Sequence, residues 1–381
     1  MKIRCLLIFL FTGFTLSGHF TLSAQQNNMQ GGKLNNLTAG HSKIIVLKHF
    51  IDSVAQNYLT NPANSSLSIG VSDGTHTERY FYGETIKGTH QLPDGNSLYE
   101  IASISKTFTG LLLAHAVNTG KLRLDDDIRE YLPGSYPNLQ YKGTPIKIVN
   151  LSNHTATFPH SPADLEKQPS YDAANPYLNY SKAMIYKYLH NFKPDTVPGL
   201  RATYSNLGFA VLGTILENIY HQPIEELLHI TITAPLKMDN TFFNLPASKK
   251  NFLTKGYKEK TGTEVPHWNL KNFKAAGGLK SDINDMLLYL NANMNELNTD
   301  YTLTQKQTDD RGDFQKGLAW TLEPLANQQL IWHNGGTAGY RSFCGFIKNQ
   351  QTGVVVLSNS ASDVDELATT ILTFMLKNKG V

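Results

Sequence analysis

The sequence predicts a mixed α/β fold of the α+β type, in which one antiparallel sheet is built from both ends of the chain. Two observations lead to this prediction. The middle of the chain shows helices, loops and prolines with little strand signal. The β-rich runs lie on either side of it, at residues 67–72, 79–82, 329–333, 342–347 and 353–359.

The elements between these runs divide the expected fold into two lobes. Asp73-Gly74 separates the first two β-rich runs and is typical of a hairpin turn. The sheet lobe should comprise residues 43–102 and 275–381, and a mainly helical lobe should span residues 103–274. A cleft between two lobes is a common place for a binding site. Helices are expected at residues 42–58, 108–117, 282–293 and 363–377.

The N-terminus has the pattern of a secretory signal. Lys2 precedes the apolar run of residues 6–15, and small residues ending at Ala24 resemble a signal-peptidase site. The run is shorter than the roughly 20 residues that span a bilayer. We therefore expect residues 1–24 to be a signal peptide and the protein to be periplasmic or secreted, with a retained membrane anchor as the alternative.

Composition limits the partners and cofactors. Residues 25–42 are rich in Asn, Gln and Gly and read as a flexible lead-in. The charged fraction is 17 % and the net charge is +3, without a block of Lys or Arg that would indicate nucleic acid. No obligatory protein partner is evident, and the oligomeric state stays open. Asp125-Asp126-Asp127 has no second ligand cluster, so we expect a solvated turn and no metal.

The first candidate motif is Ser103-x-x-Lys106. A neutral serine is a poor nucleophile and needs a base within hydrogen-bond reach. If a helix begins at Ser103, residues i and i+3 share one face, so Lys106 can activate the hydroxyl. The alternative is a helix cap with a solvated lysine, because this motif is common by chance.

The second motif is Tyr204-Ser205-Asn206. A tyrosine beside a lysine can be held as, or easily become, a phenolate, since the cation favours the charged form. A phenolate can accept and return a proton. The amide of Asn206 can bind an amide of a substrate. The alternative is an ordinary helix start with a half-buried tyrosine.

The third motif, His333-Asn334-Gly335-Gly336, ends a β-rich run. Glycines let a substrate backbone approach the strand, and a free backbone N–H there can stabilise an oxyanion. His333 can donate or relay a proton near neutral pH. The alternative is a glycine turn with a surface histidine.

Taken in this order, S-x-x-K, then Y-S-N, then H-x-G near the C-terminus resembles the serine β-lactamase and penicillin-binding superfamily. Tyr204 at the head of the second motif is similar to the class C branch and its relatives, which include DD-carboxypeptidases, D-aminopeptidases and esterases. The resemblance runs from about residue 43 to the end. Supporting stretches are GKLRLDDDIREYLP, VNLSNHTAT, TVPGLRATYSNLGFAVLGTILE, APLKMDNTFF and AAGGLKSDINDM.

The resemblance implies a β-lactamase/transpeptidase-like fold and a role for each motif. Ser103 would be the nucleophile, with Lys106 and Tyr204 sharing the proton transfers. Asn206 would bind the substrate's acyl-side amide, and the N–H groups of Ser103 and Gly336 would form the oxyanion hole. The mechanism would be acyl transfer to the serine followed by hydrolysis, without a metal or an organic cofactor.

Two departures from the family pattern affect these expectations. His333-Asn334-Gly335 stands where class C enzymes have Lys-Thr-Gly, so the charge that anchors a substrate carboxylate is less dependable. Arg341 can supply that charge or can point to solvent. The family's His-Thr-Ser-Gly is replaced by His154-Thr155-Ala156-Thr157, which should change a loop, with His154 as a buried hydrogen-bonding residue.

The leading hypothesis is an exported serine hydrolase acting on β-lactams, on D-alanyl-D-alanine-type peptides, or on both. The first alternative is an esterase or a D-aminopeptidase on the same fold. The second is a non-catalytic penicillin-binding sensor that traps its ligand. The substrate would be a small molecule or a peptide in each case, and loop shapes around the cleft would decide among them.

Overall fold

The computed structural model describes residues 44–310 and 315–379. The chain divides into two compact units, Met1–His49 and Phe50–Val381. In the first unit, residues 44–49 are helical. The second unit contains the sheet and every site discussed below.

The predicted signal peptide (residues 1–24) and lead-in (residues 25–42) lie outside the described residues. Among the residues that are described, none of the helices is both long enough and apolar enough to cross a membrane. Export therefore stays a prediction.

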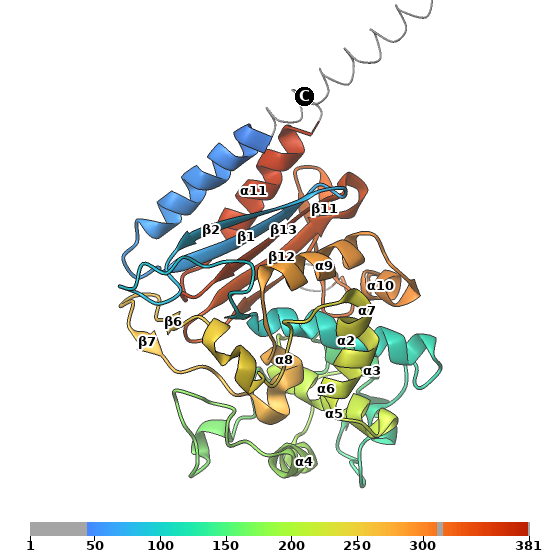
Figure 1. Ribbon diagram of the computed structural model, residues 1–381. Coiled ribbons are helices and arrows are strands. Elements are labelled where there is room, and N and C mark those ends of the chain that lie inside the picture. The colour runs from blue at the N-terminus through green and yellow to red at the C-terminus, as the bar shows by residue number, and fades with distance from the viewer. Residues whose placement is uncertain (1–43, 311–314, 380–381) are drawn as a thin grey trace, which may run out of the picture. The chain divides into compact units, whose positions relative to one another are not determined.

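Within the described residues, seven strands form one antiparallel sheet in the order β2-β1-β13-β12-β11-β10-β9 (Figure 1). Strands from the two ends of the chain pair directly, with Ile69 of β1 opposite Val356 of β13. The strands are β1 Ser66–Ser72, β2 Thr77–Gly83, β9 Gln315–Lys316, β10 Thr321–Leu325, β11 Gln328–Gly336, β12 Arg341–Ile347 and β13 Thr352–Ser358. The predicted fold class is confirmed.

Within the seven-stranded sheet, the sequence did not predict β9 and β10, which extend one side of it. β9 has two residues, too few for a periodic pattern. β10 contains Pro324, which lacks a backbone N–H for the ladder and is found on edge strands or at bulges. In the sequence, both segments therefore have the pattern of a loop.

The helices come mainly from the middle of the chain. Besides the helical residues 44–59, the α-helices are α2 Ser105–Asn118, α3 Ile148–Ser152, α4 Lys182–Asn191, α5 Asn206–Tyr220, α6 Ile224–Leu228, α7 Ala234–Leu236, α8 Lys274–Gly277, α9 Ile283–Met294, α10 Thr299–Thr304 and α11 Asp365–Lys377. Short helical turns are η1 Ala102–Ile104, η2 Ile128–Tyr131, η3 Leu165–Lys167, η5 Ala247–Phe252, η6 Lys271–Phe273 and η7 Lys348–Gln350, and a π-helical turn, η4, spans His229–Thr233. Short strand pairs are β3 Tyr99–Glu100 with β8 Lys280–Ser281, β4 Gln140–Tyr141 with β5 Thr144–Pro145, and β6 Gly256–Tyr257 with β7 Glu264–Val265.

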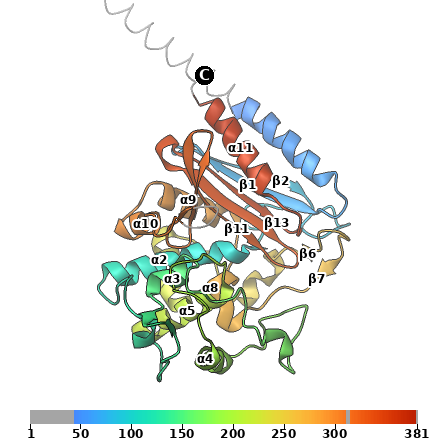
Figure 2. The ribbon, with the colours of Figure 1, turned by 180° about the vertical axis from the view of Figure 1, so that it is seen from behind.

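The sheet is covered by α9 on one face and by α11 on the other (Figures 1 and 2). Every residue of β1 and β13 is buried, as expected for strands covered on both sides. A Cβ on Gly70 would lie 2.9 Å from Leu287, and one on Gly353 would lie 2.8 Å from Leu290. These glycines therefore allow α9 to approach the sheet closely.

The hairpin between β1 and β2 forms at the predicted dipeptide. The Asp73 carboxylate accepts hydrogen bonds from the backbone N–H groups of Thr75 (2.9 Å) and His76 (2.8 Å). Gly74 has φ = +93°, a left-handed conformation that glycine adopts without steric cost.

The helix that follows the candidate serine, α2, is central to the fold. All residues from Ser105 to Ala114 are buried, and α5, α8 and α10 pack around the helix. A helix that is surrounded on all sides has no face exposed to solvent. This explains the unbroken run of apolar residues Gly110–Ala114. The chain before this helix is therefore held in a rigid setting.

The pairing of β3 with β8 ties the segment before this helix to the segment after α8. Glu100 lies opposite Lys280 in the register, and both side chains are buried. Burial raises the pKa of Glu100 and lowers that of Lys280, while each partly offsets the shift of the other. Glu100 also accepts a hydrogen bond from the backbone N–H of Trp268 at 2.7 Å.

Asp282 caps the N-terminus of α9 and is fully buried. Its carboxylate accepts from the backbone N–H of Asp285 (2.9 Å) and from Asn240 Nδ2 (2.6 Å). Burial, and then the nearby Asp285 carboxylate, raise the pKa of Asp282 to about 7. Because this pKa is higher in the folded state than in the unfolded state, stability is lost as the pH rises through about 7.

We expect Asp282→Asn to reduce this loss, since asparagine is also a good helix cap and carries no charge. Between pH 5 and pH 8 the free energy of unfolding should fall roughly 1–3 kcal/mol more in the wild type than in the variant, at about 1.4 kcal/mol per unit of pKa shift. Urea unfolding at several pH values measures this. Parallel pH curves for the two proteins would contradict it.

Candidate active site

Ser103 lies in the turn η1, between β3 and α2. The turn η1 runs directly into α2, which begins at Ser105, and Ser103 and Lys106 lie on one face as the spacing predicted. Ala102 has φ = +47°, which interrupts a regular helix at this point. Ser105 Oγ donates to the carbonyl of Ala102 (2.6 Å) and accepts from the N–H of Leu279 (3.0 Å). Ser105 thus holds the turn that presents Ser103.

Lys106 lies in the first turn of α2 and is fully buried. Its Nζ donates to Ser103 Oγ (3.0 Å), Asn206 Oδ1 (2.7 Å) and the carbonyl oxygen of Ala276 (2.6 Å). These acceptors match the hydrogens of an ammonium. Burial lowers the pKa of Lys106 well below its usual value, so the neutral amine is accessible. In the neutral form, the hydrogen bond with Ser103 reverses and the serine donates to nitrogen.

Tyr204 approaches Ser103 from the loop before α5. Its hydroxyl donates to Ser103 Oγ at 2.6 Å, and its ring packs on His154 with centroids 4.5 Å apart. Lys106 Nζ lies over the same ring, 4.7 Å from the centroid. Tyr204 is 40 % exposed as a residue, but the protein around its hydroxyl displaces water, and this desolvation raises the pKa of Tyr204.

In the free protein the raised pKa therefore favours the phenol form of Tyr204 over a held phenolate. The desolvation of the Tyr204 hydroxyl outweighs any help from Lys106, which faces the ring. Ser103 Oγ accepts hydrogen bonds from both neighbours, so its own proton is directed to neither of them. One of these bonds must reverse before the serine can lose its proton.

The position of Tyr204 is set by the loop around His154. The backbone N–H of Ser205 donates to His154 Nδ1 (3.1 Å), and that of Thr203 donates to the His154 carbonyl (2.7 Å). Ser205 Oγ donates to the carbonyl of Pro159 (2.7 Å). His154 is 5 % exposed, and burial lowers its pKa well below the usual range. It is the buried hydrogen-bonding residue that the sequence predicted.

Asn206, the first residue of α5, is turned toward Lys106. Its amide nitrogen donates to Tyr177 OH (3.0 Å) and lies 3.3 Å from His160 Nε2. Protein groups therefore surround the amide that the sequence assigned to substrate binding. His160 and Tyr177 were missed, because they lie in loops that match no motif.

β11 brings the third motif to the nucleophile. His333 and Gly335 lie on the face of β11 that meets η1, and a Cβ on Gly335 would collide with the carbonyl of Ile101. His333 Nδ1 donates to the carbonyl of Asn334 at 2.5 Å, which leaves Nε2 as an acceptor. Burial and Lys106 lower the pKa of His333 to about 3, so the imidazole is neutral.

Asn334 and Arg341 require a correction, because both side chains lie on the opposite face of the sheet. Asn334 Nδ2 donates to Asp365 of α11 at 2.5 Å. Arg341 Nη1 donates to the carbonyl oxygen of Thr337 at 2.9 Å. Side chains alternate between faces along a strand, so residues next to His333 and Gly335 must point away from Ser103. Neither predicted side chain presents a polar group to the serine.

A cavity of about 480 Å³ adjoins the site on the side of Asn206. Two of its residues, His160 and Tyr177, contact Asn206 directly. Its wall is largely apolar and aromatic. The lining residues are His160, Ser161, Pro162, Ala163, Leu165, Glu166, Lys167, Tyr171, Pro176, Tyr177 and Trp268.

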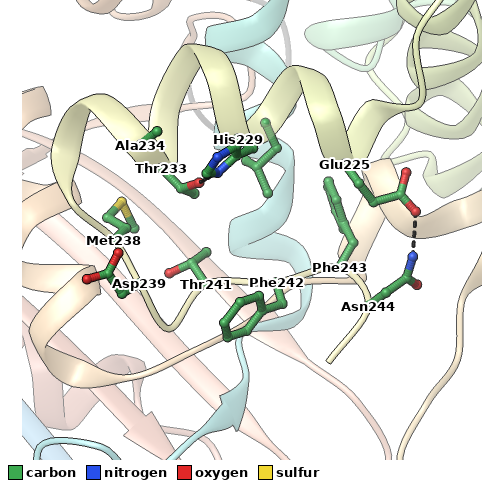
Figure 3. A pocket seen from close by; sticks show the side chains of 11 residues that line it. Glu225, His229, Thr233, Ala234, Met238, Asp239, Thr241, Phe242, Phe243 and Asn244 are labelled. Carbon is green, nitrogen blue, oxygen red and sulfur yellow. Dashed lines mark hydrogen bonds between the residues drawn. The ribbon is translucent and has the colours of Figure 1, made fainter. Parts of the chain in front are cut away.

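A second cavity of about 400 Å³ lies elsewhere, beside α6 and η4 (Figure 3). It shares no lining residue with the site around Ser103. Glu225 accepts a hydrogen bond from Asn244 at its edge, at 2.7 Å. The geometry thus concentrates the candidate chemistry at Ser103.

A family model described as Beta-lactamase matches residues 51–373. The chain belongs to the Beta-lactamase family. The β-lactamase of Pseudomonas fluorescens is 24 % identical over 355 residues, covering 82 % of this chain and 93 % of that protein. The D-alanyl-D-alanine-carboxypeptidase/endopeptidase AmpH of Escherichia coli (strain K12) is 27 % identical over 331 residues, covering 81 % of this chain and 82 % of that protein.

Solved structures agree with this assignment at the level of the fold. A β-lactamase/D-alanine carboxypeptidase from Yersinia pestis, complexed with citrate, superposes with a TM-score of 0.76 at 22 % identity, over 87 % of this chain and 98 % of that chain. A class C β-lactamase gives 0.75 at 23 % identity, over 87 % and 96 %. The predicted family and the β-lactamase-like fold are confirmed.

One departure from the family pattern has a visible structural cost. Thr157, which stands where the family usually has glycine, has φ = +62°. This conformation is unfavourable for a β-branched residue. Thr157 is 7 % exposed, and its hydroxyl finds no hydrogen-bond partner among residues 44–310 and 315–379. The loop thus keeps the left-handed backbone conformation that favours glycine, although residue 157 is a threonine.

We expect Thr157→Gly to stabilise the protein by about 1 kcal/mol, because it removes left-handed strain that costs roughly 1–2 kcal/mol in an L-residue. Thermal and urea unfolding measure the change. The matched control is Ala156→Gly at the neighbouring buried position, which should destabilise the protein. Equal destabilisation by both substitutions would contradict the strain argument.

Proposed function

We propose that this protein is an exported serine hydrolase that forms an acyl-enzyme on Ser103 and hydrolyses β-lactams, D-alanyl-D-alanine-type peptides, or both. The observation that carries the proposal is the position of the Ser103 hydroxyl, 3.0 Å from the nitrogen of Lys106 and 2.6 Å from the phenol of Tyr204. The names of the family relatives support the same reaction class.

In the first step, Lys106 in its amine form accepts the Ser103 proton as the oxygen attacks the substrate carbonyl. The lowered pKa of Lys106 favours this role, whereas the raised pKa of Tyr204 keeps the phenol protonated. Tyr204 then donates its proton to the leaving nitrogen as the amide bond breaks. The resulting phenolate, beside the ammonium of Lys106, takes a proton from the water that attacks the ester. Lys106 returns its proton to Ser103 Oγ as the ester bond breaks.

The negative charge on the carbonyl oxygen needs donors aimed at it. The backbone N–H groups of Ser103 and Gly336 are the proposed donors. Their proximity is supported by the packing of β11 on η1, where Gly335 allows the two backbones to approach closely. These groups act on developing charge, so they matter most in the transition state.

The steps use side chains and backbone groups of the chain itself. Among the described residues, no cluster of three or more His, Cys, Asp or Glu side chains is placed to hold a metal ion. The proposed partner is a small-molecule or peptide substrate. Its acyl group would extend toward the cavity beyond Asn206, whose aromatic wall suits an apolar substituent.

One observation favours the first alternative, an esterase or D-aminopeptidase. His333 is neutral, and Arg341 lies on the far face of the sheet. Neither expected anchor therefore presents a positive charge to a substrate carboxylate near Ser103. A substrate without that carboxylate would lose less binding energy here than a β-lactam or a D-alanyl peptide.

A labelled penicillin should form a covalent adduct on the wild type and none on Ser103→Ala. Turnover of nitrocefin, a diacyl-D-Ala-D-Ala peptide or a nitrophenyl ester should fall by at least about 10³-fold in that variant, since the nucleophile is lost. The exposed Ser248, replaced by alanine, is the matched control. Retained turnover in Ser103→Ala would move the nucleophile elsewhere.

Tyr204→Phe should slow turnover by about 10²–10⁴-fold, as expected when a general acid–base group is removed. Because the phenolate would activate the hydrolytic water, the penicillin adduct should also persist longer. Mass spectrometry of the adduct over time measures its lifetime. Tyr141→Phe, in the short strand β4, is the control. An unchanged adduct lifetime would remove Tyr204 from the hydrolysis step.

A further inference from the structure

The amide of Asn206 is enclosed by protein groups on both of its ends. Its oxygen accepts from Lys106 at 2.7 Å. Its nitrogen donates to Tyr177 OH at 3.0 Å and lies 3.3 Å from His160 Nε2. An amide nitrogen carries two hydrogens, so these two neighbours use both of them.

We propose that His160 and Tyr177 are positioning residues, which hold the Asn206 amide with its oxygen toward Lys106 and thereby keep Lys106 aligned on Ser103. The proposal rests on the proposed function, and it assigns roles to two residues outside the three motifs.

The orientation of the amide follows from its neighbours. If Asn206 were flipped, its NH₂ group would face the donors of Lys106, and its oxygen would face the acceptor nitrogen of His160. Both contacts would then lack a hydrogen bond, at a site where Lys106 is fully buried. His160 therefore selects the orientation that leaves an acceptor for the lysine, and Tyr177 accepts the second amide hydrogen.

The two positioning residues are themselves linked. His160 Nδ1 lies 3.0 Å from Ser161 Oγ, and Ser161 Oγ lies 2.6 Å from Tyr177 OH. The backbone also contributes, because the N–H of Asn206 donates to the carbonyl of His160 at 2.8 Å. The four side chains form a closed ring, and His160 can accept from Asn206 only when its Nε2 is unprotonated.

The ring of His160 also packs on Tyr204, with centroids 5.8 Å apart and planes 25° apart. One histidine thus contacts both the residue that holds Lys106 and the proposed acid. This explains why an exposed loop residue has a defined position beside the nucleophile.

The arrangement makes the alignment of Lys106 sensitive to acid. The ring of Tyr204 packs on His160, and the charge of Lys106 in α2 acts on it. Tyr177, in the loop that follows His160 in the sequence, is linked to it through Ser161. Glu166 and Lys167 of η3 line the same cavity. Partial desolvation of its ring by neighbouring groups, and then the Lys106 charge, lower the pKa of His160, so the neutral form is favoured at pH 7. Protonation of His160 at Nε2 would place an N–H group of the imidazolium against the N–H of the Asn206 amide. It would also place a second positive charge near Lys106.

The first test compares two substitutions of His160. Phenylalanine keeps a ring beside Tyr204 but removes the acceptor, whereas glutamine keeps an acceptor oxygen. We expect the acylation rate with a labelled penicillin, or with a nitrophenyl ester, to fall about five- to tenfold in His160→Phe at pH 7. His160→Gln should recover most of it, and both variants should melt at the wild-type temperature.

The pH profile separates positioning from a general structural effect. As the pH falls below the ordinary titration range of histidine, the wild-type rate should fall more steeply than the His160→Phe rate, because the variant lacks one protonation step. Equal rates for the wild type, His160→Phe and His160→Gln at every pH would overturn the proposal. So would a loss in His160→Phe that glutamine does not recover.

A readout that needs no turnover distinguishes this proposal from the proposed function. The measurement is an NMR titration of protein labelled at histidine, in which the His160 resonance is assigned by its absence in His160→Phe. This resonance should titrate at higher pH in Asn206→Asp than in the wild type, because a carboxylate would then face Nε2 of His160. The surface residue His229 is the control. An unchanged His160 titration would overturn the positioning role even if Ser103 is acylated. A shifted titration without acylation by any probe would refute the proposed function alone.

Discussion

The site depends on the burial of one cation. Lys106 is fully enclosed, and a buried ammonium is tolerated only where its hydrogens find acceptors. Ser103, Asn206 and Ala276 supply those acceptors from segments far apart in the chain. The burial that requires these acceptors also lowers the pKa of Lys106. A structural constraint therefore favours the neutral amine of Lys106, which is the form that can accept a proton.

The rest of the fold keeps these segments in place. α2 is surrounded on every side, so its first turn cannot shift without disturbing the core. β3 and β8 tie the chain before Ser103 to the chain after Ala276. β11 packs against η1 at Gly335, where no larger residue fits. Rigid elements on three sides thus fix a hydroxyl to within hydrogen-bond distance of its two proton-transfer partners.

Burial shifts the pKa values of the titratable groups of the site in different directions, and these shifts give the groups different roles. The pKa of Lys106 is lowered and that of Tyr204 is raised, so one favours accepting a proton and the other favours donating it. His333 and His160 have lowered pKa values, which favour their neutral forms at pH 7. The surroundings of Ser103 therefore carry little charge apart from Lys106, and the state of that residue controls the first step.

The sequence alone determined the family, the sheet built from both ends of the chain and the meeting of Ser103, Lys106 and Tyr204, because residue types and their order carry that information. Tertiary packing decided which face of β11 meets the serine. The period-two pattern of a strand shows that Asn334 points to the opposite face of the sheet from His333 and Gly335, and that Arg341 likewise points away from its neighbour in β12. The pattern does not show which face of the sheet η1 covers. The hydrogen-bond ring of His160, Ser161, Tyr177 and Asn206 was equally hidden, because contacts between loops leave no periodic pattern in a sequence.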